Sequence, residues 1–221
     1  MAEKKKKYPV YAVGPAAAKY VHLTVPQTKY KKDGEFSLNL LFRPDDPQLA
    51  QLRAQVEAGH EAALIEARKE NPELEDKTNI FKADTEKDDE GNKIPTGLIS
   101  VKFAHLAQGK KKDGTIWKFR PAVFDSAGVP VPASTEIYDG SQLFVSFGMK
   151  HTLMPTGAFY TSLPLQGVQI HTLRDSFQKA ASSYGFGTVQ GGYVQDGEDA
   201  FGEKDEESGP EEQHGPIVAD F

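Results

Sequence analysis

An acidic segment at the end of the chain limits which residues can build a folded core. Residues 191–221 contain ten Asp or Glu residues and one Lys, a net charge of −9, and they end in Asp220-Phe221. Such a segment cannot bury enough apolar surface to offset the entropy lost on ordering, so we predict that it is disordered. A purely solvating tail has no need of a large aromatic residue beside its terminal carboxylate. We therefore interpret Asp220 and Phe221 as the anchor for a protein partner.

The remainder of the chain is basic overall, and its charge is unevenly distributed. The 221 residues carry a net charge of −6, so the residues before the acidic segment carry +3. Residues 1–44 carry +6, residues 45–93 carry −7 and residues 94–190 carry +4. We predict one folded domain over residues 1–184, with an acidic insert at about 45–93, followed by a flexible linker and tail over residues 185–221.

Alternation of apolar and polar residues predicts a mainly β domain. Residues 36–43, 101–104, 117–120 and 143–150 alternate in this way, which is typical of strands with one buried face. Further strands are expected at residues 20–25, 159–163 and 168–173. The sequence Lys-Lys-Asp-Gly occurs twice, at 31–34 and 111–114, and Asp-Gly favours a hairpin turn with positive φ. Short antiparallel strands with such turns suggest a small Greek-key barrel.

The acidic insert contains a predicted helix. Asp45-Asp46-Pro47 is a helix start signal, and Asn71-Pro72 ends the pattern. Apolar residues at helical spacing follow the start: Leu49, Leu52, Val56, Ala63 and Ile65. Gly59 weakens the middle and could split the helix in two. We predict that the nearly all-charged residues 82–93 form a solvated loop, and that residues 175–183 form a short closing helix.

The sequence lacks recognisable catalytic, metal-binding and membrane signals. It has no Cys, and its six His residues show no metal-binding spacing. The acidic cluster at 84–90 lacks the calcium-loop pattern, and Gly185-Phe186-Gly187 lies outside a strand–turn–helix context. We therefore predict no enzymatic activity, no cofactor and no metal. The absence of an apolar run of about 18 residues predicts no membrane span, and the charged residues 1–7 are not followed by a signal-peptide core.

Basic residues interleaved with aromatic residues indicate binding of single-stranded nucleic acid. Cations neutralise phosphates, and rings stack on unpaired bases with about 1–3 kcal/mol per base. The candidate contacts are Tyr30, Lys31, Lys32, Arg43, Lys102, Lys110, Lys111, Lys112, Trp117, Lys118, Arg120 and Lys150. The alternative is that Phe103, Trp117 and Phe119 are core residues beside lysines that merely face water. Alternation also prevents Trp117 and Lys118 from facing the same side of one strand.

Together these features resemble the single-stranded DNA-binding proteins of short-tailed bacteriophages. The resemblance rests on the basic segments 31–43 and 110–124, the helical insert 45–70 and the tail that closes with Ala219-Asp220-Phe221. It implies an OB-fold-like (oligonucleotide-binding) barrel that coats and protects single-stranded DNA during DNA replication, recombination and repair, in the cytoplasm of the infected bacterial host. It further implies that the tail recruits phage or host replication proteins, such as a polymerase or a helicase/primase, and competes with DNA for the basic groove. It leaves homodimer formation open.

Two other functions are compatible with the same residues. The barrel of a non-enzymatic adaptor would bind protein rather than DNA, with the tail as a peptide ligand. A hydrolase or nuclease would need a site that the sequence does not reveal, because the basic body holds no cluster of carboxylates and His. A mobility-shift assay separates DNA binding from the adaptor function, and a metal-dependent cleavage assay tests for the nuclease.

Overall fold

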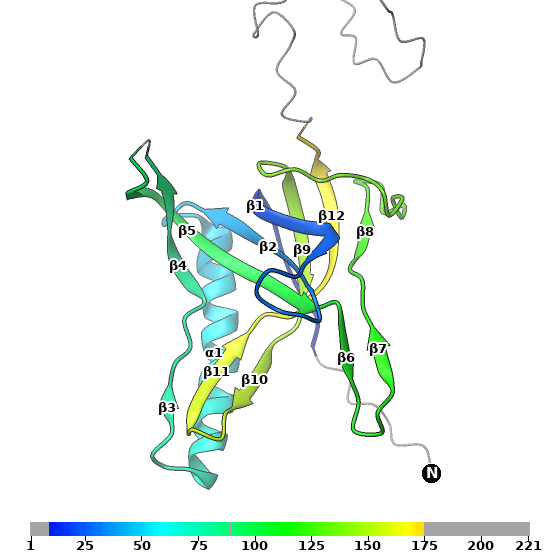
Figure 1. The fold of residues 1–221 in the computed structure, drawn as a ribbon. Coiled ribbons are helices and arrows are strands. Elements are labelled where there is room, and N and C mark those ends of the chain that lie inside the picture. Colours follow the sequence, from blue (N-terminus) through cyan, green and yellow to red (C-terminus); the bar gives the residue numbers. More distant parts are fainter. Residues whose placement is uncertain (1–8, 89, 175–221) are drawn as a thin grey trace, which may run out of the picture. The chain divides into compact units, whose positions relative to one another are not determined.

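The structure is a computed structural model that describes residues 9–88 and 90–174, and strands predominate in this part of the chain (Figure 1). The predicted helix at 175–183, Asp220 and Phe221 lie outside the described residues. The strands are β1 (Tyr11–Gln27), β2 (Glu35–Phe42), β3 (Glu75–Asp76), β4 (Phe81–Lys87), β5 (Lys93–Leu106), β6 (Gln108–Lys110), β7 (Ile116–Lys118), β8 (Ala122–Phe124), β9 (Gln142–Phe147), β10 (Lys150–Leu153), β11 (Ala158–Ser162) and β12 (Leu165–Thr172). Helix α1 (Pro47–Glu70) lies between β2 and β3 in the chain.

Five strands form the barrel. They lie in the order β5-β2-β1-β9-β12 within a seven-stranded sheet whose edges are β4 and β8. All neighbouring pairs among these five are antiparallel. The N–H of Ala104 on β5 donates to the carbonyl of Leu163, just before β12, over 3.2 Å, which brings the two ends together. This five-stranded, partly open Greek-key arrangement confirms the predicted OB-fold-like barrel.

Strand β1 is long enough to belong to both halves of the barrel. Its first half pairs with β9, from Tyr11 to Ala17, and its second half pairs with β2, from Ala17 to Gln27. The register shifts between Val13 and Ala16. Gly14 at this bend has φ of +123°, and a Cβ there would lie 2.5 Å from the carbonyl oxygen of Leu143. Only glycine therefore permits this close approach of the two backbones.

Alternating apolar side chains fill the barrel as the sequence predicted. On the inner face, Leu38 and Leu40 of β2 lie opposite Phe103 and Val101 of β5, respectively. Phe103 also packs against Phe147 of β9, with ring centroids 5.1 Å apart. Phe42 and Phe103 are both fully buried. Phe103 is therefore a core residue, as the core alternative predicted, and the neighbouring ring and cation at 42–43 and at 102–103 do not form a shared exposed surface. Adjacent residues of a strand point to opposite faces, so a buried ring places its charged neighbour outside.

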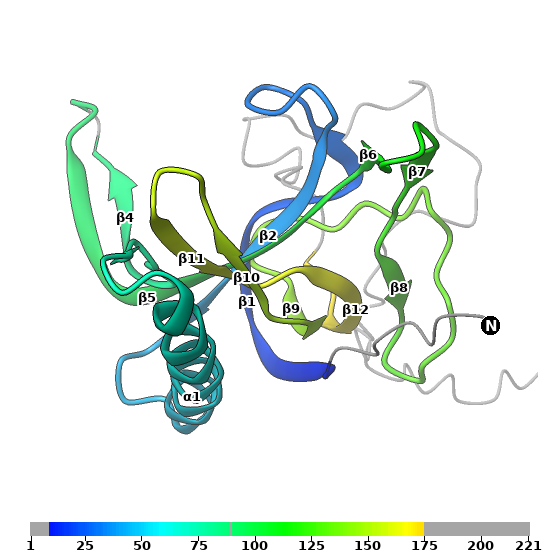
Figure 2. The same ribbon diagram turned by 90° about the horizontal axis from the view of Figure 1, so that it is seen from below.

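Helix α1 runs without interruption through Gly59. Figure 2 shows the helix viewed nearly along its axis. Its N-terminus is capped by Asp46, whose carboxylate accepts the N–H of Gln48 over 2.8 Å. Leu49, Leu52 and Val56 on one face are buried against the barrel core. A Cβ at Gly59 would lie 2.8 Å from Sδ of Met149, so this glycine makes room for the β9–β10 corner instead of splitting the helix.

The charged residues 82–93 form most of a β-hairpin, so the prediction of a solvated loop is wrong. Strands β4 and β5 pair from Phe81–Val101 to Lys87–Lys93. The connecting turn is held by Asp88, whose carboxylate accepts the N–H of Asn92 over 2.7 Å. Pairing with β5, which continues into the buried core, stabilises β4 despite its high charge. Both Lys-Lys-Asp-Gly segments form turns with positive φ at Gly34 and Gly114, as predicted.

Candidate nucleic-acid interface

The outer face of β2 and β5 carries a polar groove of about 320 Å³. Asn39 and Lys102 lie opposite one another on this face, because the residues that alternate with them point into the core. One wall comes from the end of β11 and the residue after it, and another from residues 79–82. We call this the central groove; it is lined by Lys31, Glu35, Asn39, Asn79, Ile80, Lys82, Ser100, Lys102, Ala104, Thr161, Ser162 and Leu163.

A buried carboxylate brings two of the predicted cations together in the central groove. The Glu35 side chain is 8% exposed, and its Oε1 accepts a hydrogen bond from Nζ of Lys102 over 2.6 Å. Nζ of Lys31 donates to the second oxygen. Burial disfavours the ionised Glu35, but the two lysines outweigh that effect and hold its pKa below the ordinary value. The ammonium-bearing side chains remain 51% and 55% exposed for Lys31 and Lys102.

The floor of the central groove is neutral and polar. Nδ2 of Asn39 donates to Oγ of Ser100 over 2.8 Å. Lys82 of β4 lies opposite Ser100 and adds a third cation, which the sequence prediction missed because its segment was interpreted as a loop. Tyr160 was also missed. It is exposed on β11 two residues before Ser162, so both side chains lie on the same face of that strand.

A second groove, of about 600 Å³, lies between the β1–β2 turn and the β6–β7 hairpin. Lys32, Lys118 and Arg120 line it together with Phe36 and Phe119. We call it the lateral groove. Consecutive lysines of one turn therefore serve different grooves, Lys31 the central groove and Lys32 the lateral groove.

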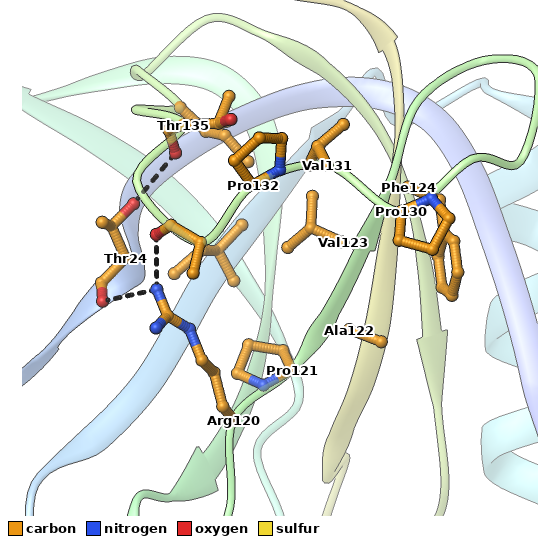
Figure 3. A pocket seen from close by; sticks show the side chains of 13 residues that line it. Thr24, Arg120, Pro121, Ala122, Val123, Phe124, Pro130, Val131, Pro132 and Thr135 are labelled. Atoms are coloured by element: carbon orange, nitrogen blue, oxygen red, sulfur yellow. Dashed lines mark hydrogen bonds between the residues drawn. The ribbon is translucent and has the colours of Figure 1, made fainter.

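Arg120 has a structural role in addition to lining the lateral groove. Its Nη2 donates to the backbone carbonyls of Thr24 over 3.3 Å and Ala133 over 2.5 Å. Figure 3 shows the guanidinium directed toward these oxygens at the edge of an apolar pocket of about 250 Å³. Oγ1 of Thr24 donates in turn to the carbonyl of Thr135. Arg120 thus holds the segment around residues 130–135 against β1.

Trp117 lies on the β6–β7 hairpin and outside the main core. A Cβ on Gly109, its cross-strand partner, would come within 2.5 Å of the indole, so the ring lies directly on that glycine. His105 contacts the indole edge-on, with centroids 5.7 Å apart. The Trp117 side chain is half-buried, so the indole is neither fully packed in a core nor fully exposed for stacking on a base. Phe119 packs instead against Phe36 and His105, as the core alternative predicted.

The remaining predicted contacts lie apart from the central groove. Lys110, Lys111 and Lys112 are exposed at the tip of the β6–β7 hairpin (Figure 1). Tyr30 is exposed in the β1–β2 turn, with Nζ of Lys29 5.4 Å from its ring centroid. Arg43 is exposed directly after β2. Lys150, at the start of β10, lines a separate cavity of about 610 Å³ beside Tyr11 and His151.

Within residues 9–88 and 90–174, no group of three or more His, Asp or Glu side chains is placed to hold a metal ion. The arrangement most like a catalytic one joins Asp76, His60 and Thr161. Nε2 of His60 lies 2.8 Å from Oδ2 of Asp76, and its Nδ1 lies 2.8 Å from Oγ1 of Thr161. The Thr161 hydroxyl is buried and also bonds Nδ1 of His151 over 2.9 Å. This cluster joins α1 to the β10–β11 hairpin.

In the described part of the chain, α1 is not apolar enough to cross a membrane.

Comparison with known proteins identifies the fold. No family model and no curated protein matches the chain. Among solved structures, gp2.5, a single-stranded DNA binding protein encoded by bacteriophage T7, aligns with a TM-score of 0.61 and 19% identity over 86% of this chain and 100% of that chain. The single-stranded DNA-binding protein from bacteriophage Enc34 in complex with ssDNA aligns with a TM-score of 0.52 and 14% identity, over 76% and 89% of the two chains. The chain has the fold of these bacteriophage single-stranded DNA-binding proteins.

Proposed function

We propose that this protein binds single-stranded DNA along the central groove with little sequence preference. The observation that carries the proposal is the position of that groove. It lies on the second and third barrel strands, between the turn joining the first two strands and the connection joining the last two. This is the face on which OB-folds bind oligonucleotides. Its cations, Lys31, Lys82 and Lys102, are suited to the phosphate backbone.

The chemistry of the central groove supports sequence tolerance. Lysine recognises a phosphate as a point charge and reads no base. The amide and hydroxyl of Asn39 and Ser100 already bond one another, which reduces their capacity to read base edges. The exposed rings of Tyr30 and Tyr160 can stack on any base, because every base has a π-face. Half-buried Trp117 is a further stacking candidate from the β6–β7 hairpin.

We further propose that the tail supplies a second function. In this hypothesis the folded domain comprises residues 1–184, and the linker and tail comprise residues 185–221. Asp220 and Phe221 recruit replication proteins, and the tail's acids compete with DNA for the basic grooves. A tail with ten acids and one base is complementary to grooves lined by lysines. The protein would act without enzymatic activity in DNA replication, recombination and repair, in the cytoplasm of the infected bacterial host, with homodimer formation left open.

Fluorescence anisotropy with labelled oligothymidylate tests the DNA proposal. We expect the full chain to bind the single strand more tightly than a duplex of the same length. We also expect log affinity to fall with log salt by about 0.7 for each phosphate contacted. Unlabelled oligonucleotides of other sequences should compete about equally well. Equal binding of single and double strands, or a salt slope near zero, contradicts the proposal and favours the protein-binding adaptor.

A further inference from the structure

The central groove contains an anion of its own. Among the described residues that line it, Glu35 is the only acid. Its carboxylate bonds Lys102 and Lys31, which are two of the three lysines in the groove. The trio therefore carries a net charge of +1 where the two lysines alone would carry +2. Two cations that should bind DNA phosphates are already occupied in the free protein.

The three side chains differ in their freedom to move. Glu35 is 8% exposed and belongs to a strand that pairs on both sides, with Gln27 of β1 and Leu106 of β5. Lys31 and Lys102 are half-exposed and end in flexible four-carbon stems. The carboxylate is therefore fixed, whereas the ammonium groups can turn toward solvent and exchange partners.

A carboxylate and a phosphate present the same chemistry to an ammonium group. Both are anionic oxygen acceptors of short, charge-assisted hydrogen bonds. The next residues on the same outward face of β2, Ser37 and Asn39, are neutral, so an acid is not a general feature of this face. A buried ion pair is also a weak source of net stability, since desolvation offsets the attraction.

We propose that Lys31 and Lys102 form a phosphate subsite, and that their ammonium groups bond the fixed Glu35 carboxylate until a DNA phosphate takes its place as their partner. The inference rests on the proposed DNA-binding function and adds a regulator to it. Glu35 weakens binding at this point of the groove and keeps the two lysines placed while DNA is absent. When DNA binds, the two ammonium groups exchange the carboxylate for a phosphate. The reverse exchange is equally available, which favours release of the strand as well as its capture.

The test compares two full-length variants that remove the same charge. Glu35→Gln keeps the size of the side chain, and Glu86→Gln serves as the control because Glu86 is 70% exposed and does not line the central groove. Oligothymidylate binding is measured by anisotropy at low salt. We expect Glu35→Gln to bind roughly tenfold more tightly than wild type, and Glu86→Gln to stay within about twofold, because screening weakens distant exposed charges.

A second set of variants, in which the two lysines are absent, distinguishes a local subsite from a long-range effect of the Glu35 charge. With Lys31→Ala and Lys102→Ala already present, adding Glu35→Gln should raise affinity far less than it does in the wild-type background. A similar gain in both backgrounds overturns the subsite, since it would show that Glu35 acts only through its charge. Unchanged or weaker binding by Glu35→Gln overturns the proposal while leaving DNA binding intact. Absence of DNA binding by the wild type overturns the proposed function and this inference with it.

A measurement on the wild-type protein covers the case in which Glu35→Gln does not fold. The side-chain carboxyl ¹³C signal of Glu35 is followed by NMR while oligothymidylate is added. We expect the signal to shift on saturation, because the carboxylate loses its two ammonium partners. The signals of Glu86 and other exposed acids serve as the internal reference. A Glu35 signal that stays in place on saturation overturns the exchange.

Discussion

Nζ of Lys19 on β1 lies 2.8 Å from Oδ2 of Asp84 on β4, and the two side chains are 14% and 5% exposed. The same Nζ donates to the carbonyl of Thr85, and Asp84 accepts a further hydrogen bond from Oγ1 of Thr96. Burial opposes the charge on Lys19, but the hydrogen bond and charge attraction of Asp84, together with the weaker attraction of Tyr20 and Glu86, outweigh burial and raise the pKa of Lys19 above its ordinary value. This ion pair joins the first barrel strand to the projecting β4–β5 hairpin.

Lys19→Met should destabilise the protein by about 3 kcal/mol, because it leaves the Asp84 carboxylate buried without its cation. Adding Asp84→Asn should recover much of that loss, since the pair contributes little net stability once both charges are gone. Urea denaturation of the two variants measures both values. If the double variant is as unstable as the single variant, unpaired charge is not the cause.

Replacing the central-groove lysines should weaken DNA binding more than replacing an equal number elsewhere. We expect Lys31→Ala, Lys82→Ala and Lys102→Ala together to lower the salt slope by about 2, at about 0.7 per phosphate contact. The matched control replaces the three lysines 110–112 at the hairpin tip. Anisotropy at several salt concentrations compares the two triple variants. A larger loss in the control would move the DNA path to the β6–β7 hairpin.

Trp117 provides a test that needs no mutation, because it is the only tryptophan in the chain. If the exposed side of the indole stacks on a base, oligonucleotide should quench its fluorescence, and Trp117→Ala should cost about 1–3 kcal/mol of binding. Thermal denaturation of the same variant separates lost stacking from lost packing on Gly109 and His105. Fluorescence that stays constant at saturation would place the bases away from this hairpin.

Acidification should loosen the contact between α1 and the β10–β11 hairpin. Desolvation and the neighbouring His60 lower the pKa of His151 from its ordinary 6.5. The folded state therefore binds fewer protons than the unfolded state as pH falls below 6.5, and stability is lost in that window. His151→Gln should show a smaller fall in Tm between about pH 7.5 and pH 5.5, whereas His171→Gln should behave as wild type. An unchanged fall in His151→Gln would assign the pH dependence to other groups.

The tail hypothesis separates into two measurable effects. Deleting residues 191–221 should tighten DNA binding, because a net charge of −9 no longer competes with phosphate. Phe221→Ala keeps that charge, so competition should persist while partner binding falls by about 2 kcal/mol or more. A polymerase or helicase pull-down measures the second effect. If partner binding survives Phe221→Ala but fails after the acids are neutralised, the tail attracts its partners through charge alone and Phe221 is not an anchor.

Local patterns in the sequence predicted most of the barrel. Alternation identified β2, β9 and residues 101–104 of β5, and Asp-Gly identified both turns. Strand β4 was missed because charged residues hide its pattern, and its pairing with β5 is decided by tertiary contact. The length of β1 was missed because Pro15 and Pro26 interrupt the apolar pattern and Gly14 bends it.

The candidate site was less predictable than the fold. Net charge and composition identified the basic residues. However, a ring and a cation that are adjacent in the sequence do not have to lie on the same surface of the fold. Lys102 and Phe103 cannot share a surface, because they alternate along β5. The meeting of Lys31 with Lys102 depends on the β2–β5 register and on a buried acid between them. No local signal in the sequence reports that contact.

The β1–β2 turn, which sends Lys31 to one groove and Lys32 to the other, also sets a length scale for the ligand. A short oligonucleotide can occupy one groove and meet only its cations. A longer one has to pass around residues 28–34 before it gains the second set, so its path is curved. Affinity should then rise in two steps as the oligonucleotide is lengthened, and the two ends of a strand that spans both grooves should lie closer together than in an extended strand.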